Sequence, residues 1–77
     1  LLQGIIDAFF VEETEEGKAV ILVDYKTDNI NDISVLSGRY REQMRLYAEA
    51  LRKSMDVNVR ECILYSLKLR DSISLFF

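Results

Sequence analysis

The sequence predicts an α/β domain of the α+β type, built on a mixed β-sheet with the element order β-β-α-β-β. Runs rich in β-branched and aromatic residues cover 4–11 and 19–27 near one end of the chain, and 59–67 and 72–77 near the other. Between them, 38–54 has apolar residues at three- and four-residue intervals, which is the period of an amphipathic helix. Because one long helix separates the two pairs of strands, we expect it to cross over and cover one face of the sheet.

The composition is typical of one small folded domain. Of the 77 residues, 49% are hydrophobic and 30% are charged, which distinguishes the chain from a disordered one. The first residue is not methionine, and the residues that follow already have the pattern of a strand, so we expect a fragment of a longer chain. Apolar runs fall short of the roughly 20 residues of a membrane span, so no membrane association is expected.

The residue inventory restricts the chemistry. The chain has no histidine, which excludes Ser–His and Cys–His catalysis within these residues. Its single cysteine, Cys62, excludes an internal disulfide and a cysteine-only metal cluster. A reaction would have to use carboxylates, lysine, tyrosine or an oxygen-bound metal. The net charge of −3 argues against a free-standing DNA-binding module, because phosphate contacts need a basic surface, unless a larger assembly supplies it.

The central strand is predicted from five consecutive apolar residues at 19–23, followed directly by Asp24, Tyr25 and Lys26. An unbroken apolar run indicates a strand that is covered on both faces. Since side chains alternate along a strand, Asp24 and Lys26 project to one face and Tyr25 to the other. An acid and a base therefore stand side by side where the strand ends. For an isolated Asp-x-Lys, an ion pair on the surface is the commoner explanation.

The first strand contains a carboxylate, Asp7, among apolar residues. Such a group is costly unless it is paired or binds a metal. The acidic connection 12–17 predicts a hairpin to the central strand. A hairpin symmetric about Thr14–Glu15 would place Asp7 opposite Leu22 or Val23, one step from Asp24. The two carboxylates would then lie within reach of one ion.

The helix has one apolar and one charged face. The apolar face is predicted to consist of Tyr40, Met44, Tyr47, Ala48 and Leu51. The opposite face carries Arg41, Arg45, Glu49, Arg52 and Lys53. Asp32, Ser34 and Ser37 are candidate N-caps. Gln43 and Tyr47 are four residues apart and would lie on one flank, where a tyrosine at the edge of the core beside a solvated glutamine is the ordinary explanation.

The last two strands are predicted from their alternation. In 59–67 the apolar face is predicted to contain Val59, Ile63, Tyr65 and Leu67, interrupted by Glu61. In 72–77 we expect a short edge strand with Ile73 and Leu75 inward and Ser72 and Ser74 exposed.

Three short motifs occur in order along the chain: Gly4-Ile5-Ile6-Asp7, Asp24-Tyr25-Lys26-Thr27 and Gln43-x-x-x-Tyr47. Together they resemble the nuclease motifs of the RecB family, which belongs to the PD-(D/E)XK nuclease superfamily. The whole chain is similar to the C-terminal end of the AddA-type subunits of bacterial helicase–nucleases. The resemblance implies that 1–77 is the C-terminal part of a single nuclease domain with a restriction-endonuclease-like fold. Three motifs in register favour a functional site over a solvated surface.

The resemblance also implies the roles of individual residues. Asp7 and Asp24 would hold Mg²⁺ or Mn²⁺, with the main-chain carbonyl of Tyr25 as a further ligand. Asp7, Asp24 and Lys26 would form the catalytic centre, with Lys26 orienting or deprotonating the attacking water. No iron–sulfur cluster is implied. The family's upstream histidine and glutamate have no counterpart among these residues.

Gln43 and Tyr47 resemble the helix-borne pair that supports the site and contacts DNA. The implied function is a DNA exonuclease domain within one subunit of an ATP-dependent helicase–nuclease, acting in double-strand-break repair and recombination in the bacterial cytoplasm. ATP would be used only by the helicase part. The implied partners are single-stranded DNA and the other subunit of the helicase–nuclease, and the isolated fragment is expected to associate with itself. The alternative is a catalytically silent nuclease fold kept for assembly with other subunits or for DNA tracking, against which the intact Asp7, Asp24 and Lys26 argue.

Overall fold

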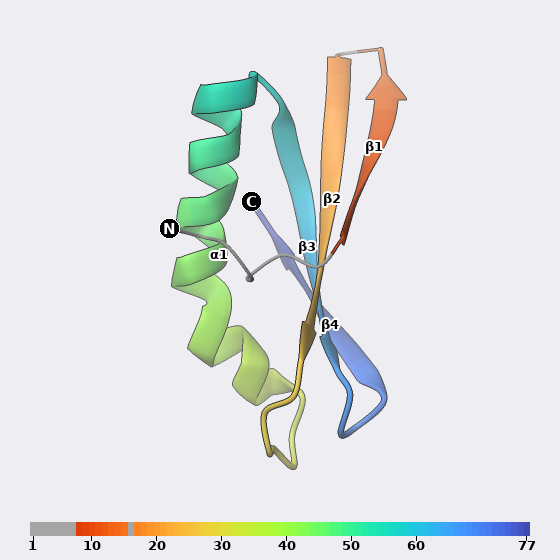
Figure 1. Cartoon of the computed structure of the whole chain (residues 1–77), viewed down its shortest axis with the longest axis vertical. Helices are drawn as coiled ribbons and strands as arrows, with labels where there is room; N and C mark the ends of the chain where they lie inside the picture. The colour runs from red at the N-terminus through yellow and green to blue at the C-terminus, as the bar shows by residue number, and fades with distance from the viewer. Residues whose placement is uncertain (1–7, 16) are drawn as a thin grey trace.

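The computed structural model describes residues 8–15 and 17–77, and the side chains of 11–15 and 17–77. In this part of the chain, four strands and one helix follow one another in the predicted order (Figure 1). The elements are β1 (Ala8–Thr14), β2 (Gly17–Lys26), α1 (Ser34–Met55), β3 (Asn58–Ser66) and β4 (Asp71–Phe76).

The sheet is mixed, as predicted. Its strand order is β1-β2-β3-β4, with antiparallel pairs at both ends and a parallel pair, β2 and β3, in the centre. Parallel neighbours cannot be joined by a tight turn, so the chain crosses over through α1 between them. The helix lies against β3 and β4 on one face of the sheet (Figure 1).

The core lies between α1 and the sheet. Its buried apolar side chains are Val20, Leu22, Ile30, Leu36, Met44, Ala48, Val59, Cys62, Leu64 and Leu75. The predicted apolar face of the helix is confirmed, since Met44 and Ala48 are buried and Tyr40, Tyr47 and Leu51 pack against them. The helix begins four residues earlier than predicted, which adds Leu36 to the core.

Local hydrogen bonds define both ends of α1. The Oδ1 atom of Asp32 accepts the backbone N–H of Ser34 at 2.9 Å and its hydroxyl at 2.8 Å, while Ile33 occupies the N-cap position without a side-chain cap. At the other end Asp56 adopts a left-handed conformation, with φ 53°, and donates its N–H to the carbonyl of Arg52 at 3.1 Å. This geometry ends the helix before Val57.

The hairpin between β1 and β2 corrects the predicted register. Thr14 pairs with Gly17, so the turn is centred one residue later than Thr14–Glu15, and Ala8 pairs with Val23. The observed register therefore differs from the predicted one by one to two residues. Gly17 supplies a positive φ of 120°, and the hydroxyl of Thr14 donates to its carbonyl at 2.8 Å, which closes the turn at this point. Asp7 lies outside the described residues.

The predicted inward face of β3 is wrong beyond its first residue. Val59 is buried as expected, but Cys62, Leu64 and Ser66 follow it into the core in place of Ile63, Tyr65 and Leu67. The register with β2 shifts here, because Val20 pairs with Val59 whereas Ile21 pairs with Glu61. The extra residue on β3 is a bulge, and it reverses the alternation of all the side chains that follow.

The cover of β2 differs between its two faces. Toward α1, Val20, Leu22 and Asp24 are buried, whereas on the other face Ile21 and Val23 are only half-buried in the part of the chain that is described. The expectation of equal cover is therefore met on one face. Strand β4 is an edge strand, as predicted, with Leu75 buried. The described residues include no helix with the length and apolar character of a membrane span.

Candidate active site

Asp24 and Lys26 form a buried ion pair at the C-terminal end of β2. The Nζ atom of Lys26 lies 3.1 Å from Oδ2 of Asp24, and the two side chains are 14% and 1% exposed. The predicted alternation is confirmed, since Tyr25 points to the opposite face, where it is 48% exposed and meets Tyr65 edge to face. The pair is therefore not the exposed surface ion pair that an isolated Asp-x-Lys would ordinarily form.

The surroundings of Asp24 are hydrocarbon. Asp24 pairs in register with Leu64 on β3, and Leu22 and Cys62 are fully buried on the same side of the sheet. Burial, and then the negative charge of Asp24, raises the pKa of the Cys62 thiol to about 12. A carboxylate in such a setting depends on its partner, because removing one half of a buried pair costs about 3–5 kcal/mol. Nothing about the stability of a strand end requires this arrangement.

Lys26 also contacts Tyr40 of α1. Its Nζ lies 3.9 Å from the centroid of the Tyr40 ring, which is a cation–π contact. The Tyr40 hydroxyl donates to the Asp28 carboxylate, 2.8 Å from Oδ2 and 3.1 Å from Oδ1. Arg39 donates to the same Oδ2 at 2.8 Å. A chain of contacts thus runs from Asp24 through Lys26 and Tyr40 to Asp28.

These contacts determine protonation. The hydrogen bond from Tyr40 lowers the pKa of the Asp28 carboxyl, burial works against it, and Arg39 lowers the pKa further. Burial and the bond to Asp28 raise the pKa of Tyr40. Asp28 is therefore ionised and Tyr40 neutral at pH 7. Sequence reasoning placed Tyr40 in the core and overlooked Asp28. The signal was the spacing Asp24-x-Lys26-x-Asp28, which continues one face beyond the end of the strand.

The segment that follows Lys26 is held by the turn between β3 and β4. The N–H of Leu67 donates to the carbonyl of Lys26 at 3.0 Å. The ammonium of Lys68 donates to the side-chain oxygens of Asn29 at 2.6 Å and Asn31 at 3.2 Å. These bonds fix the point at which the chain leaves the sheet, and with it the position of Asp28.

The other predicted site residues lie on α1. Gln43 is exposed, and Tyr47 is half-buried against the core. They follow Tyr40 by three and seven residues, which places all three on one flank of the helix. Tyr47 also lines an apolar hollow of about 220 Å³ together with Val20 and Leu22. The structure therefore brings Asp24 and Lys26 into contact and places Gln43 and Tyr47 farther along the same side of α1.

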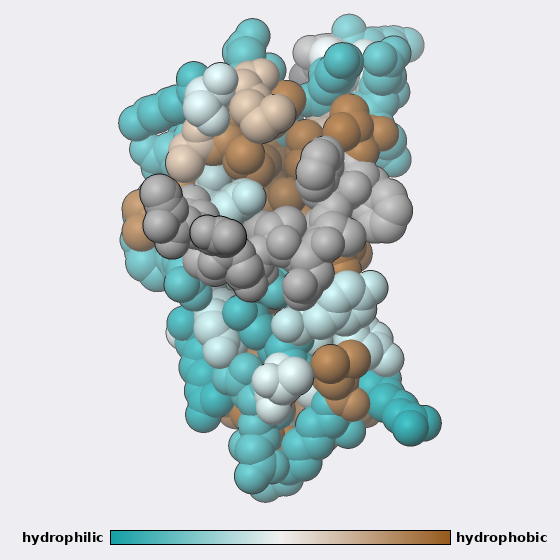
Figure 2. Space-filling model, viewed as in Figure 1, coloured by the Kyte–Doolittle hydropathy of each residue, from teal (hydrophilic) through white to brown (hydrophobic). Residues whose placement is uncertain are grey.

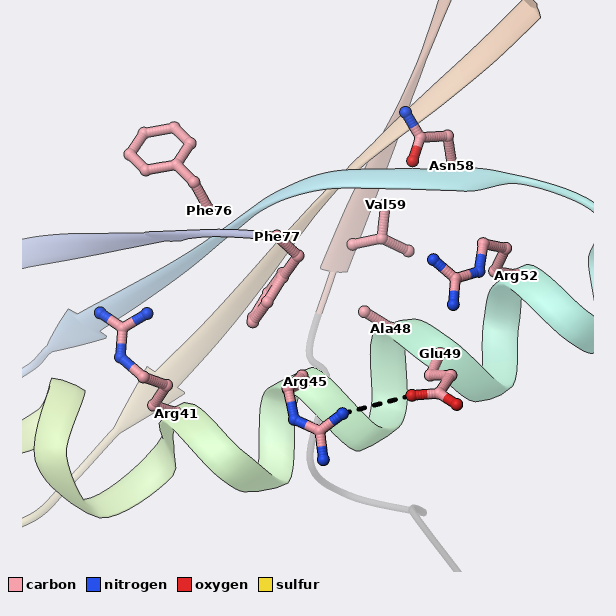
Figure 3. A pocket seen from close by; sticks show the side chains of 9 residues that line it. All are labelled: Arg41, Arg45, Ala48, Glu49, Arg52, Asn58, Val59, Phe76 and Phe77. Carbon is pink, nitrogen blue, oxygen red and sulfur yellow. Dashed lines mark hydrogen bonds and ion pairs between the residues drawn. The ribbon is translucent and has the colours of Figure 1, made fainter.

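A second hollow, of about 390 Å³, lies on the other flank of α1 (Figure 3). It is lined by Arg41, Arg45, Ala48, Glu49, Arg52, Asn58, Val59, Phe76 and Phe77. Arg45 bonds to Glu49 at 3.3 Å and pairs with Glu42. None of the predicted catalytic residues that the structure describes reaches this hollow. Helical periodicity separates Arg45 from Gln43 by about 200° around the axis, so the two flanks face different ways.

Comparison with known proteins identifies the family. The model of the PD-(D/E)XK nuclease superfamily matches residues 1–72 of the chain. The chain belongs to this superfamily.

Relatives of this PD-(D/E)XK chain include much longer proteins. It is 44% identical, over 95% of its length, to an ATP-dependent helicase/nuclease subunit of Lachnoclostridium phytofermentans. It is 41% identical, over 97% of its length, to the protein of the same name from Clostridium botulinum strain Loch Maree. The chain spans only 5% and 6% of the lengths of these relatives. Both are subunits of the AddA type, so the predicted resemblance is confirmed.

Nucleases of the PD-(D/E)XK superfamily generally use divalent metals. Asp24 offers the hard oxygen donor that Mg²⁺ prefers, at the end of a strand and next to a cation that is already in place. Within 8–15 and 17–77 the structure gathers no group of three or more cysteine, aspartate or glutamate side chains around one point. Asp24 fits a metal site as one of its carboxylates, and the second carboxylate expected from the sequence, Asp7, is not among the described residues.

Proposed function

We propose that this chain carries the catalytic centre of a metal-dependent DNA exonuclease, within one subunit of an ATP-dependent helicase–nuclease. The observation that carries the proposal is the buried Asp24–Lys26 pair at the end of β2, in a chain of the PD-(D/E)XK superfamily. The names of the relatives support the helicase–nuclease context. Single strands delivered by the helicase would be the substrate, in double-strand-break repair in the bacterial cytoplasm, and the partner would be the other subunit of the complex.

Asp24, Asp7 and the main-chain carbonyl of Tyr25 would hold the ion, Mg²⁺ or Mn²⁺. When bound, the ion supplies a water of lowered pKa and neutralises charge on the scissile phosphate. Asp24 is well suited to this task because its carboxylate is fixed by the strand and is 1% exposed. A fixed ligand in a site that excludes water acts more strongly than a mobile one.

Lys26 would act on the water and on the phosphate. Its ammonium has three N–H donors, and the contact to Asp24 at 3.1 Å leaves others to direct at the reacting atoms. A positive charge held beside the phosphate stabilises the negative charge that develops in the transition state. Gln43 and Tyr47 would support the DNA strand from the same flank of α1.

The test uses the full protein that contains this chain. Asp24→Ala and Lys26→Ala are expected to abolish degradation of single-stranded DNA and to leave ATP-driven unwinding nearly intact. Added Mg²⁺ should partly rescue Asp7→Ala by mass action, but it should not rescue Lys26→Ala. Lys18→Ala, at an exposed lysine on the same strand, is the matched control and should keep the parental rate.

The decisive measurement is DNA degradation by each variant across a metal titration, with unwinding followed in parallel. If Lys26→Ala degrades DNA at the parental rate, the end of β2 is not the catalytic centre. A silent nuclease fold kept for assembly would give that result for all three aspartate and lysine variants.

A further inference from the structure

We propose that Tyr40 is a positioning residue of this site, whose ring holds the ammonium of Lys26 beside Asp24. The inference rests on the proposed function, because Tyr40 acts here through Lys26. It extends the site from the strand end to the second turn of α1.

The first step is the pair of contacts made by Lys26. Its Nζ lies 3.1 Å from Oδ2 of Asp24 and 3.9 Å from the centroid of the Tyr40 ring. A lysine side chain has four rotatable bonds and loses about 1.5–2 kcal/mol of rotamer freedom when it is fixed. A cation within about 6 Å of a ring centroid is attracted to the ring, more strongly where water is excluded. Lys26 is 14% exposed, so both contacts act in a poorly solvated place.

The second step is the anchoring of the ring itself. The Tyr40 hydroxyl donates to both oxygens of Asp28, and Arg39 holds that carboxylate from the neighbouring position on α1. Asp28 follows Lys26 by two residues, so the anchor and the cation come from the same short segment. The aromatic ring is thus fixed at its hydroxyl end by Asp28, while its face meets Lys26. A leucine at position 40 could fill part of the core but could neither attract the cation nor reach Asp28.

The third step is what this arrangement requires of the enzyme. A lysine that acts in the transition state must be held close to its productive place, since a displacement of about 1 Å can cost on the order of 100-fold in rate. Loss of the ring should therefore lower kcat, whereas KM for DNA should change little because Tyr40 does not touch the strand. The ring, rather than the hydroxyl, should carry most of the effect.

The experiment measures kcat and KM for degradation of single-stranded DNA by the full protein with Mg²⁺ and ATP. Tyr40→Leu is expected to lower kcat about tenfold or more. Tyr40→Phe keeps the ring and should restore kcat to within about threefold of the parent. Asp28→Asn, which weakens only the anchor, should resemble Tyr40→Phe. Tyr65→Leu changes a half-buried tyrosine on the opposite face of the sheet and is the matched control, with kcat unchanged.

ATP-driven unwinding reports the amount of folded protein in each case, and Asp28→Asn keeps the test open if Tyr40→Leu fails to fold. Three results would overturn the inference: a parental kcat in Tyr40→Leu, equal losses in Tyr40→Phe and Tyr40→Leu, or a rise in KM alone. A nuclease that survives Lys26→Ala would instead refute the proposed function. The two failures are therefore distinguishable.

Discussion

Burial determines the chemical state of single side chains next to the candidate site. Cys62 is fully buried on β3, and the pKa of its thiol is raised to about 12 by burial and then by the charge of Asp24. The thiolate is the reactive form of cysteine. The folded chain therefore keeps Cys62 as an inert apolar side chain, although it is two residues from Leu64, the partner of Asp24.

Cys62 should react with a disulfide reagent at pH 8 only after the chain unfolds. We expect labelling in native buffer to be slower than in denaturant by a factor that approaches the unfolding equilibrium constant. The measurement is the release of the coloured thiol over time in both conditions. Cys62→Ser is the blank, and rapid native labelling would show that the thiol is accessible.

Asp28 should make the stability of the fold depend on acidity. Its pKa is lowered in the folded state, by the Tyr40 hydrogen bond first, so its contribution is present above the ordinary value of 3.8 and is lost as the pH falls below it. Asp28→Asn should reduce the free energy of unfolding by about 1–2 kcal/mol at pH 7, the size of a hydrogen bond to a charged group. The difference from the parent should shrink toward pH 3 in urea titrations. A constant difference across this range would contradict the charge effect.

The residue scale also shows which parts of the site the sequence determines. Asp24 and Lys26 share a face because strand alternation is a local property, so their pairing could be predicted from spacing alone. The contact of Lys26 with Tyr40 could not, because it depends on how α1 docks across the sheet. The anchoring of Tyr40 by Asp28 depends on the same docking.

At the scale of elements, α1 and β3 were predicted with unequal success. The helix was found from its apolar period, although its first turn was missed because its start lacks a side-chain cap at the N-cap position. The inward face of β3 was wrong because a bulge beside Arg60 reverses the alternation, and no residue type there announces it. Periodic patterns predict where an element lies, whereas a single inserted residue changes which face is buried.

The first turn of α1 should contribute more to stability than its exposed apolar positions. Leu36 is fully buried, whereas Leu46 on the same helix is 52% exposed. Leu36→Ala should lower the free energy of unfolding by about 2–5 kcal/mol, because it removes buried methyl groups and leaves a cavity. Leu46→Ala is the matched control and should change it by less than about 0.5 kcal/mol. Chemical denaturation of both variants distinguishes the two positions, and equal effects would place Leu36 outside the core.

At the scale of the whole molecule, α1 covers the β3–β4 side of the sheet and leaves apolar surface toward β1. Figure 2 shows hydrophobic side chains on the upper part of this face. The residues of that surface that line the apolar hollow are Val11, Val20, Leu22, Tyr47, Leu51, Met55 and Val57. Val11 is 51% exposed and Met55 is 61% exposed, in a region where few charges oppose association.

The 77-residue chain on its own should therefore associate with itself through this hollow. Sedimentation equilibrium at high protein concentration is expected to give a mass above that of a monomer. Val11→Lys and Met55→Lys should shift the mass toward the monomer, because a charge at the rim would have to be desolvated on association. Leu67→Lys alters an equally exposed apolar residue at the other end of the sheet and should leave the mass unchanged. A monodisperse monomer of the parental chain would contradict this, and an equal response to Leu67→Lys would mean that a different surface mediates the contact.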